Sequence, residues 1–295
     1  MGMLTKKVLV ATDFSPPSKQ LLNCLEEFRC FGIEEILLTH VVDVRTAGLS
    51  TSAFHYYDEE KMNREVERLS GAGFQVTPMV PVGVPAPEIV RIAREEEAGV
   101  IVIASHGEGF IRQVFLGSTV FDVLRLSPVP VFLEKFKDGE SDTCTPVCTQ
   151  RLRRVVVPVD FSPCSRVGIL TVGSWEKMVG EILLVAVIER SRNAEELERQ
   201  RLDAAEKLEG IQKEIAGEGM AVHKRVEVGI PSRQIIKVVK EEQATLLVVP
   251  RRGRGSIRDL LLGSTAEALT RRSPVPVFLV PCQDRQNGRY DDESG

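Results

Sequence analysis

The chain has 295 residues and a formal net charge of −4, and 43% of its residues are hydrophobic. That length suits two domains of ordinary size, each with enough apolar residues for a core of its own. The negative charge and an aromatic content of only 5% argue against a nucleic-acid surface, which needs cations for phosphates and rings for stacking. The sequence shows neither a signal-peptide pattern nor an apolar run near the roughly 20 residues of a membrane-spanning helix. We therefore expect a cytoplasmic protein that binds neither nucleic acid nor membrane.

The first half alternates buried-type strands with helical patterns, which is the order that produces a parallel sheet. Its predicted strands are residues 8–12, 36–42, 74–80, 100–104 and 129–133. One helix begins at Ser15-Pro16, the residue types preferred at an N-cap and a first turn. The remaining predicted helices cover residues 59–71, 87–97 and 118–126, after a loop over 47–57.

The second half repeats this order. Residues 107–133 and 253–279 share 16 identical positions of 27, far more than chance allows, so the chain is an internal duplication. The period of about 146 residues makes the repeated unit a whole domain rather than a solenoid repeat. Its predicted strands are residues 155–159, 182–188, 222–228, 246–249 and 275–280, and its later helices are 194–216, 233–242 and 264–271.

The predicted fold class is α/β: two doubly wound, five-stranded parallel-sheet domains in strand order 3-2-1-4-5. We expect domains at residues 1–135 and 152–282, a polar linker at 136–151 and a disordered tail at 283–295. Proline cannot donate to a sheet ladder, so the last strands lie at sheet edges. Because an edge strand favours pairing, the two halves are predicted to pack as a pseudo-two-fold pair through these strands. The prolines concerned are Pro128, Pro130, Pro274 and Pro276.

A spaced glycine pair occurs in each half, where a predicted strand ends and the next helix begins. Glycine lets the backbone approach an anion, and a helix N-terminus supplies free N–H groups and partial positive charge. The pattern therefore predicts a phosphate site in each half. The residues concerned are Gly107, Gly117, Ser118 and Thr119, and Gly253, Gly263, Ser264 and Thr265.

A simple helix cap is the alternative interpretation. Ser264 and Glu267 have the spacing of a capping box, in which the serine side chain caps the helix. Phe121 replaces the glutamate in the first half, so no capping box exists there. Glu267 would also compete electrostatically with phosphate.

Two more pairs of equivalent residues follow predicted strands. Asp13 and Asp160 come directly after the first strand of each half, at the carboxyl edge where ligands bind in such sheets. Each carboxylate either accepts hydrogen bonds from a ribose or an adenine amine, or closes a local Asx-turn. Val41 and Val187 end the second strand, where each walls an adenine pocket or belongs to the sheet core.

The motifs together resemble the universal stress protein family over nearly all of both halves. They are Thr12-Asp13-Phe14-Ser15, His40-Val41-Val42-Asp43, Val82-Gly83-Val84-Pro85 and the run from Ser105-His106-Gly107 through Gly117-Ser118 to Pro128-Val129-Pro130-Val131. In that family Gly-x2-Gly-x9-Gly-Ser/Thr marks the nucleotide-binding members. The resemblance implies that Asp13 and the backbone near Val41 hold adenosine, that the glycine loop holds phosphates, and that Asp160 and Val187 act likewise.

The sequence departs from that pattern at its first glycine, which is Ala104 in the first half and Pro250 in the second. Proline fixes φ and removes a donor, so we expect the halves to differ in affinity or preferred nucleotide. Arg251 and Arg252 follow, either as phosphate ligands or as a solvated loop pair.

No catalytic or metal site is predicted. His106 becomes Arg252 in the second half, and no nucleophile motif accompanies it. Binding of Mg²⁺ with the nucleotide stays open as a role for Asp43, although its counterpart is Glu189 and no acidic cluster surrounds either residue. The cysteines lack zinc-site spacing, and we expect unpaired thiols, with a disulfide as the alternative. They are Cys24, Cys30, Cys144, Cys148, Cys164 and Cys282.

The leading hypothesis is a regulatory protein that binds adenine nucleotide, AMP or ATP, in each half; its stress-response role is implied by the resemblance alone. A slow ATPase is a second hypothesis, although it would need a metal-holding carboxylate and a positioned water. A scaffold with empty pockets and a flavin- or AMP-binding module also stay open as functions. A homodimer and a protein partner stay open as well.

Overall fold

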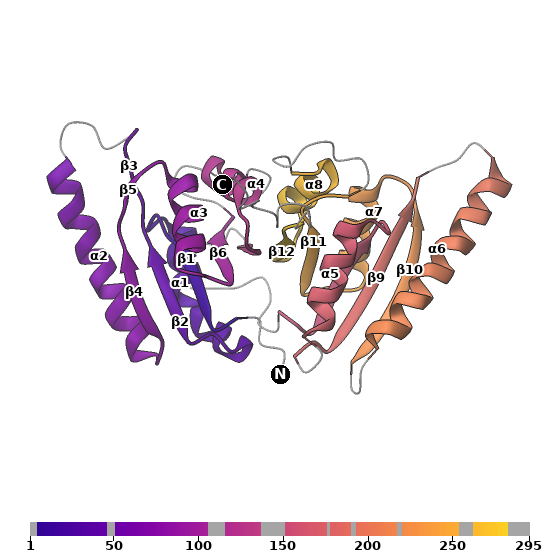
Figure 1. Cartoon of the computed structure of the whole chain (residues 1–295), viewed down its shortest axis with the longest axis horizontal. Coiled ribbons are helices and arrows are strands. Elements are labelled where there is room, and N and C mark those ends of the chain that lie inside the picture. The colour runs from indigo at the N-terminus through magenta and orange to yellow at the C-terminus, as the bar shows by residue number, and fades with distance from the viewer. Residues whose placement is uncertain are drawn as a thin grey trace, which may run out of the picture.

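A computed structural model of the chain contains one long sheet to which both halves contribute (Figure 1). The structure describes residues 5–45, 51–105, 116–136, 151–175, 178–189, 193–216, 220–253 and 262–282, with the backbone alone for Cys30 and residues 51–58. The sheet strands of the first half are β1 (Lys7–Ala11), β2 (Glu35–Thr39), β4 (Gln75–Met79), β6 (Val100–Ala104) and β7 (Val131–Glu134). Those of the second half are β8 (Arg154–Val159), β9 (Glu181–Ile188), β10 (Ala221–Val228), β11 (Leu246–Pro250) and β12 (Val277–Val280).

The strand order is β10-β9-β8-β11-β12-β7-β6-β1-β2-β4. Within each half this is 3-2-1-4-5 with parallel neighbours, so the predicted fold class is confirmed. The halves meet where β12 pairs antiparallel with β7, in the register Val277 to Leu133 and Leu279 to Val131. Pairing through the last strands is therefore also confirmed, and it covers the edge that each half would otherwise expose.

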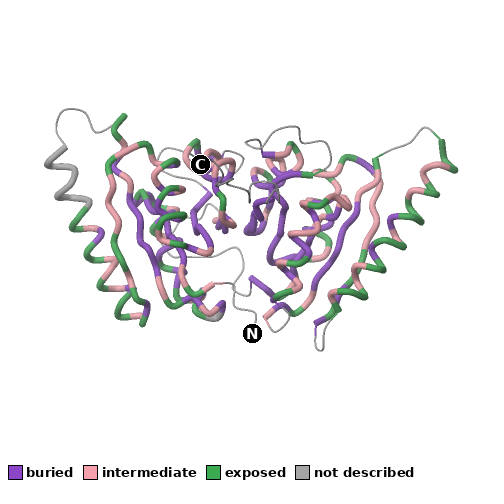
Figure 2. The backbone as a smooth tube through the Cα atoms, in the orientation of Figure 1, coloured by how far each residue is buried: buried purple, intermediate pink, exposed green. Residues whose placement is uncertain are grey.

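Helices cover both faces of the sheet. They are α1 (Pro16–Asn23), α2 (Thr51–Gly71), α3 (Pro85–Glu95), α4 (Ser118–Leu126), α5 (Pro163–Gly173), α6 (Ala194–Ile215), α7 (Pro231–Glu241) and α8 (Ser264–Arg272), with a 3-10 helix η1 (Leu25–Phe31). One core lies against α1, α2, α5 and α6, and the other lies against α3, α4, α7 and α8. Successive strand residues alternate between the cores, Val8 and Val10 facing one and Leu9 facing the other. The central strands are therefore buried on both faces (Figure 2), which explains their continuous apolar runs.

Two local predictions were wrong. The loop predicted over 47–57 is shorter, because α2 begins at Thr51. Extending an existing helix costs less than starting one, so the amphipathic segment after residue 59 carries the helix back through weakly patterned residues. The predicted strand 36–42 divides into β2 and β3 (Val42–Asp43), and β3 pairs with β5 (Val82–Gly83), which was not predicted, in a separate ribbon. Pro81 precedes β5 and cannot donate to the ladder, which accounts for the break.

Within the described residues, no helix combines the length and the apolar composition that crossing a membrane requires.

Candidate functional site

The strand order reverses between β8 and β11, and between β1 and β6 in the first half. The carboxyl ends of strands at such a reversal are where open α/β sheets bind ligands. Asp160 directly follows β8, and Gly253 comes three residues after β11. A Cβ on Gly253 would lie closer to Asp160 Oδ2 than van der Waals contact allows. The start of the glycine loop and the predicted ligand carboxylate are thus brought together, and a side chain at position 253 would require the Asp160 carboxylate to move.

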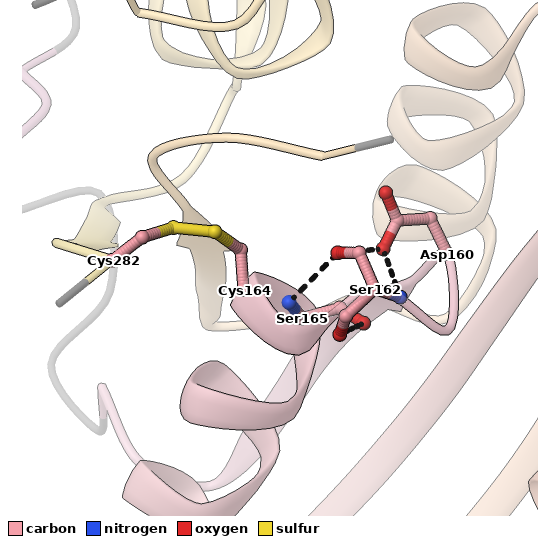
Figure 3. Close-up of a disulfide and its surroundings, with 5 residues drawn as sticks. All are labelled: Asp160, Ser162, Cys164, Ser165 and Cys282. Carbon is pink, nitrogen blue, oxygen red and sulfur yellow. Dashed lines mark hydrogen bonds between the residues drawn. A yellow bond between two sulfur atoms is a disulfide. The ribbon is translucent and has the colours of Figure 1, made fainter. Parts of the chain in front are cut away.

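Both aspartates make a local turn with one carboxylate oxygen. Oδ1 of Asp160 accepts from the Ser162 amide at 3.0 Å and from the Ser162 hydroxyl at 2.5 Å (Figure 3). Oδ1 of Asp13 accepts from the Ser15 amide at 3.0 Å and from the Ser18 hydroxyl at 2.7 Å. The Asx-turn interpretation is confirmed. The turn fixes the orientation of each carboxylate through Oδ1.

The residue after each aspartate has a left-handed backbone, with φ of 56° at Phe14 and 61° at Phe161. A bulky residue there is strained and persists only where its surroundings hold it. The Phe14 ring lies 4.9 Å from the His40 ring, and Lys61 lies over its face. Lys207 lies over the Phe161 ring in the same way, at 5.6 Å. Both halves therefore hold this turn in one uncommon conformation beside the predicted site.

The base of each glycine loop is closed by a backbone hydrogen bond. Gly117 N donates to Ser105 O at 3.4 Å, and Gly263 N donates to Arg251 O at 3.0 Å. A Cβ on Gly263 would sit 3.4 Å from Arg251 O, which is an ordinary contact, so the hydrogen bond does not itself require glycine. Residues 106–115 and 254–261 lie outside the described residues, and with them His106 and Gly107.

The two helices after the loops begin as the phosphate interpretation requires. Gly117 and Gly263 are the N-cap residues of α4 and α8, so neither cap has a side chain to occupy the first N–H groups. Ser118 and Ser264 are the first helical residues and are exposed, and Thr119 and Thr265 are half-buried.

The capping-box interpretation of Ser264 is wrong, because the N-cap is Gly263. Glu267 instead accepts from Arg271 Nε at 3.0 Å, one turn further along α8. That ion pair draws the glutamate away from the helix start.

Val41 and Val187 are half-buried at the carboxyl edge and pack against the core beneath α3 and α7. Each has part of its side chain in the core and part at the edge where Asp13 or Asp160 lies. The sheet-core interpretation is therefore correct for part of each side chain, and the adenine wall stays a prediction.

Arg251 and Arg252 are only 9% and 8% exposed, so their interpretation as a solvated loop pair is wrong. Arg251 Nη1 donates to Ser127 O at 2.8 Å and to Arg125 O at 3.3 Å, at the C-terminal end of α4 in the first half. Sequence reasoning missed this contact because a motif within one half carries no information about its partner half.

Cys164 and Cys282 form a disulfide, which corrects the expectation of unpaired thiols (Figure 3). Their Cα atoms are 5.2 Å apart, although 118 positions separate the two residues in the sequence. Because of this long sequence separation, the sequence alone did not indicate the pairing. The bond ties the first turn of α5, two residues after Ser162, to the chain just past β12. Cys144 and Cys148 lie outside the described residues.

Charged residues are buried at both ends of the predicted linker. Arg151 donates to Glu134 Oε2 from Nη2 at 2.7 Å and from Nε at 2.9 Å. Burial raises the pKa of Glu134 above its ordinary value, against the opposing effect of the Arg151 charge. Lys135 Nζ donates to Thr270 O at 2.6 Å, and burial, with a smaller effect from Arg271, lowers the pKa of Lys135 to about 8.

No metal centre emerges from the part of the chain that the structure describes, where no three His, Cys, Asp or Glu side chains are placed to share an ion.

Comparison with known proteins gives a consistent result. The sequence profile of the universal stress protein family matches the chain twice, at residues 5–134 and 151–281. A universal stress protein of Methanocaldococcus jannaschii is 31% identical over 162 residues, which cover 47% of this chain and 100% of that protein. The crystal structure of a universal stress protein from Archaeoglobus fulgidus is 29% identical, covers 94% of this chain and 98% of its own, and superposes with a TM-score of 0.69. A Pseudomonas aeruginosa protein with a TM-score of 0.66 is only 15% identical and shows the shared fold alone.

Proposed function

Because the chain belongs to the universal stress protein family, we propose that each half binds one adenine nucleotide, AMP or ATP, in a regulatory role. The observation that carries the proposal is the contact between Gly253 and the carboxylate of Asp160 at the reversal of strand order. A nucleotide needs a carboxylate for its sugar or base and a backbone-lined anion site for its phosphates. The two features adjoin here, at the edge of the sheet where such ligands bind.

The ligand would lie across the carboxyl edge of each half. Its ribose or adenine would bond to Asp13 or Asp160, with Val41 or Val187 against the base. Its phosphates would meet the N-terminus of α4 or α8, where the capping residue is glycine and the first hydroxyl is exposed. The phosphate-binding set is Gly107, Gly117, Ser118 and Thr119 in the first half and Gly253, Gly263, Ser264 and Thr265 in the second.

The second half should bind more weakly or prefer a different nucleotide. Pro250 ends β11 at the position of Ala104 and offers no N–H to an anion. Arg251 does not replace that donor, because its guanidinium is directed to the first half.

Nucleotide content tests the proposal directly. Freshly purified protein is denatured, and any released nucleotide is identified by chromatography and mass, with calorimetric titration of ATP and AMP into emptied protein. We expect about two nucleotides per chain, one for each repeat of the motif, and the loss of one in Asp13→Ala and in Asp160→Ala. Asp203→Ala is the matched control, because Asp203 is an exposed residue of α6 paired with Lys207. Protein that retains no nucleotide and gives no heat with either ligand would contradict the proposal.

A further inference from the structure

Two buried cations cross between the halves to the end of a helix. Arg251 Nη1 bonds to Ser127 O at 2.8 Å, at the C-terminus of α4. Lys135 Nζ bonds to Thr270 O at 2.6 Å, in the last turn of α8. The two cations are 9% and 7% exposed. Carbonyl groups at a helix C-terminus carry partial negative charge and need donors, so they offset part of the cost of burying a cation there.

Each cation begins at the base of the glycine loop in its own half. The carbonyl of Arg251 accepts from Gly263 N at 3.0 Å, which closes the loop of the second half. Lys135 directly follows Glu134, whose carbonyl accepts from Ser105 N at 3.0 Å. Ser105 in turn closes the loop of the first half through Gly117. Arg251 thus belongs to the loop base itself, and Lys135 follows the strand residue that is bonded to the loop base.

The helix that each cation holds leads to the glycine loop of the other half. Helix α4 has nine residues and is therefore only about 13 Å long. Its C-terminus meets Arg251, and its N-terminus is capped by Gly117. Helix α8 has the same length and runs from Gly263 to the turn that meets Lys135. A displacement at either end of so short a helix is transmitted to the other end.

The repeat alone does not produce this arrangement. The position equivalent to Arg251 is Ser105, whose side chain is too short to reach α8, and the position equivalent to Lys135 is Pro281, which has no donor. Each half therefore brings a cation to the C-terminal turn of the other half's helix, through unrelated residues from different strands and to carbonyls that are not equivalent in the repeat. Inheritance from a duplicated domain explains equivalent residues in equivalent contacts, and it does not explain a similar contact made by different residues.

We propose that Arg251 and Lys135 are positioning residues for the nucleotide site of the opposite half. Each fixes the position of the helix whose N-terminus receives phosphate in the other half, and this inference rests on the proposed function. Because each cation also stems from its own loop base, the two sites are coupled. Nucleotide bound in one half changes the affinity of the other, and by linkage the effect is reciprocal.

The test uses full-length chains with one working site. Asp160→Ala leaves the first site, and Asp13→Ala leaves the second. Arg251→Met and Lys135→Met are each placed in both backgrounds, and the dissociation constant for the better ligand, ATP or AMP, is measured by calorimetry. We expect a crossed pattern, in which Arg251→Met weakens the first site about fivefold or more and Lys135→Met does the same to the second. Each substitution should affect the opposite half more than its own.

Two variants separate positioning from loss of structure. Arg251→Lys keeps a donor for the α4 carbonyls and should recover part of the affinity of the first site. Arg251→Gln serves where Arg251→Met unfolds, as judged by circular dichroism and thermal unfolding. Equal weakening of both sites, or no weakening of either, would overturn the positioning role. Parent chains with one working site that bind no nucleotide would instead overturn the proposed function, and the coupling with it.

Discussion

Arg151→Met tests the buried ion pair between Arg151, at the start of the second half, and Glu134, the last residue of β7. The side chains of Arg151 and Glu134 are 1% and 0% exposed, and Nη2 lies 2.7 Å from Oε2. The guanidinium also lies 4.8 Å from the centre of the Phe28 ring. Removing one partner of a buried pair leaves the other charge unsolvated and costs roughly 3–5 kcal/mol. We therefore expect the free energy of unfolding to fall by about 4 kcal/mol at pH 7.

The same substitution should make stability depend on pH. Burial already raises the pKa of Glu134, and loss of the Arg151 charge raises it further. The folded state then holds a proton that the unfolded state releases above its ordinary pKa of 4.5. A raised carboxyl pKa contributes stability that is complete at low pH and is lost as pH rises through the folded pKa. The deficit of Arg151→Met should therefore shrink on acidification from pH 7 toward pH 5.

Trp175 provides the assay. It is the single tryptophan of the chain, is 2% exposed and lies 5.1 Å from the Phe278 ring, so its fluorescence reports the core of the second half. Urea unfolding is followed by this signal and by circular dichroism. The double variant Arg151→Met with Glu134→Gln should recover part of the loss and flatten the pH profile, because it removes the stranded charge. A loss below about 1 kcal/mol, or a double variant no better than the single one, would refute the buried-charge argument.

Three further outcomes are expected. Cys164→Ser and Cys282→Ser should each lower the free energy of unfolding by about 4–5 kcal/mol, because the bond restricts the unfolded chain over a loop of this length. Urea curves of either variant that match those of the parent would contradict this. Gly210→Ala should raise the stability of α6 by about 0.5–1 kcal/mol, because Gly210 is in mid-helix and its Cβ would meet no atom within 4 Å; thermal unfolding measures the gain, and nucleotide binding should not change. As the pH rises from 8 to 10.5, the free energy of unfolding of the parent should increase by up to about 3 kcal/mol relative to that of Lys135→Met, because the folded state binds fewer protons in this range than the unfolded state. Urea unfolding of both proteins at the two pH values measures this difference, and a difference that does not change with pH would contradict the prediction.

The features that follow from local pattern were predictable. The bounds of α4 match the predicted 118–126, because Gly117 marks its start and apolar residues repeat along it. The strand order follows from alternating strands and helices, and the pairing of β7 with β12 follows from prolines that require an edge. The contact between Asp160 and Gly253 was predictable only in outline, from the rule that the carboxyl ends of parallel strands share one edge.

The features that depend on which distant residues meet were not predictable. Arg151 and Lys135 belong to a polar stretch, and charged residues in such a stretch normally face water. Their burial follows from the pairing of the halves, which presses both ends of that stretch against β7 and α8. The same applies to Cys164 and Cys282, since no periodicity within α5 or β12 specifies a partner 118 positions away.

Equivalence between duplicated halves can be tested at the level of contacts as well as residues. The last carbonyls of a helix have no partner within it, so α4 and α8 both need donors where they end at the junction of the halves. Water or a polar side chain from the same half would satisfy that need locally. The chain instead uses Arg251 and Lys135, each from the other half and each from beside a loop base. Satisfying carbonyls accounts for a donor at each helix end, and it does not account for that shared origin. Communication between the two loops accounts for both. It also requires that filling one site changes the affinity of the other, so a parent chain whose two sites bind with the same affinities as in the chains with one working site would favour the simpler explanation.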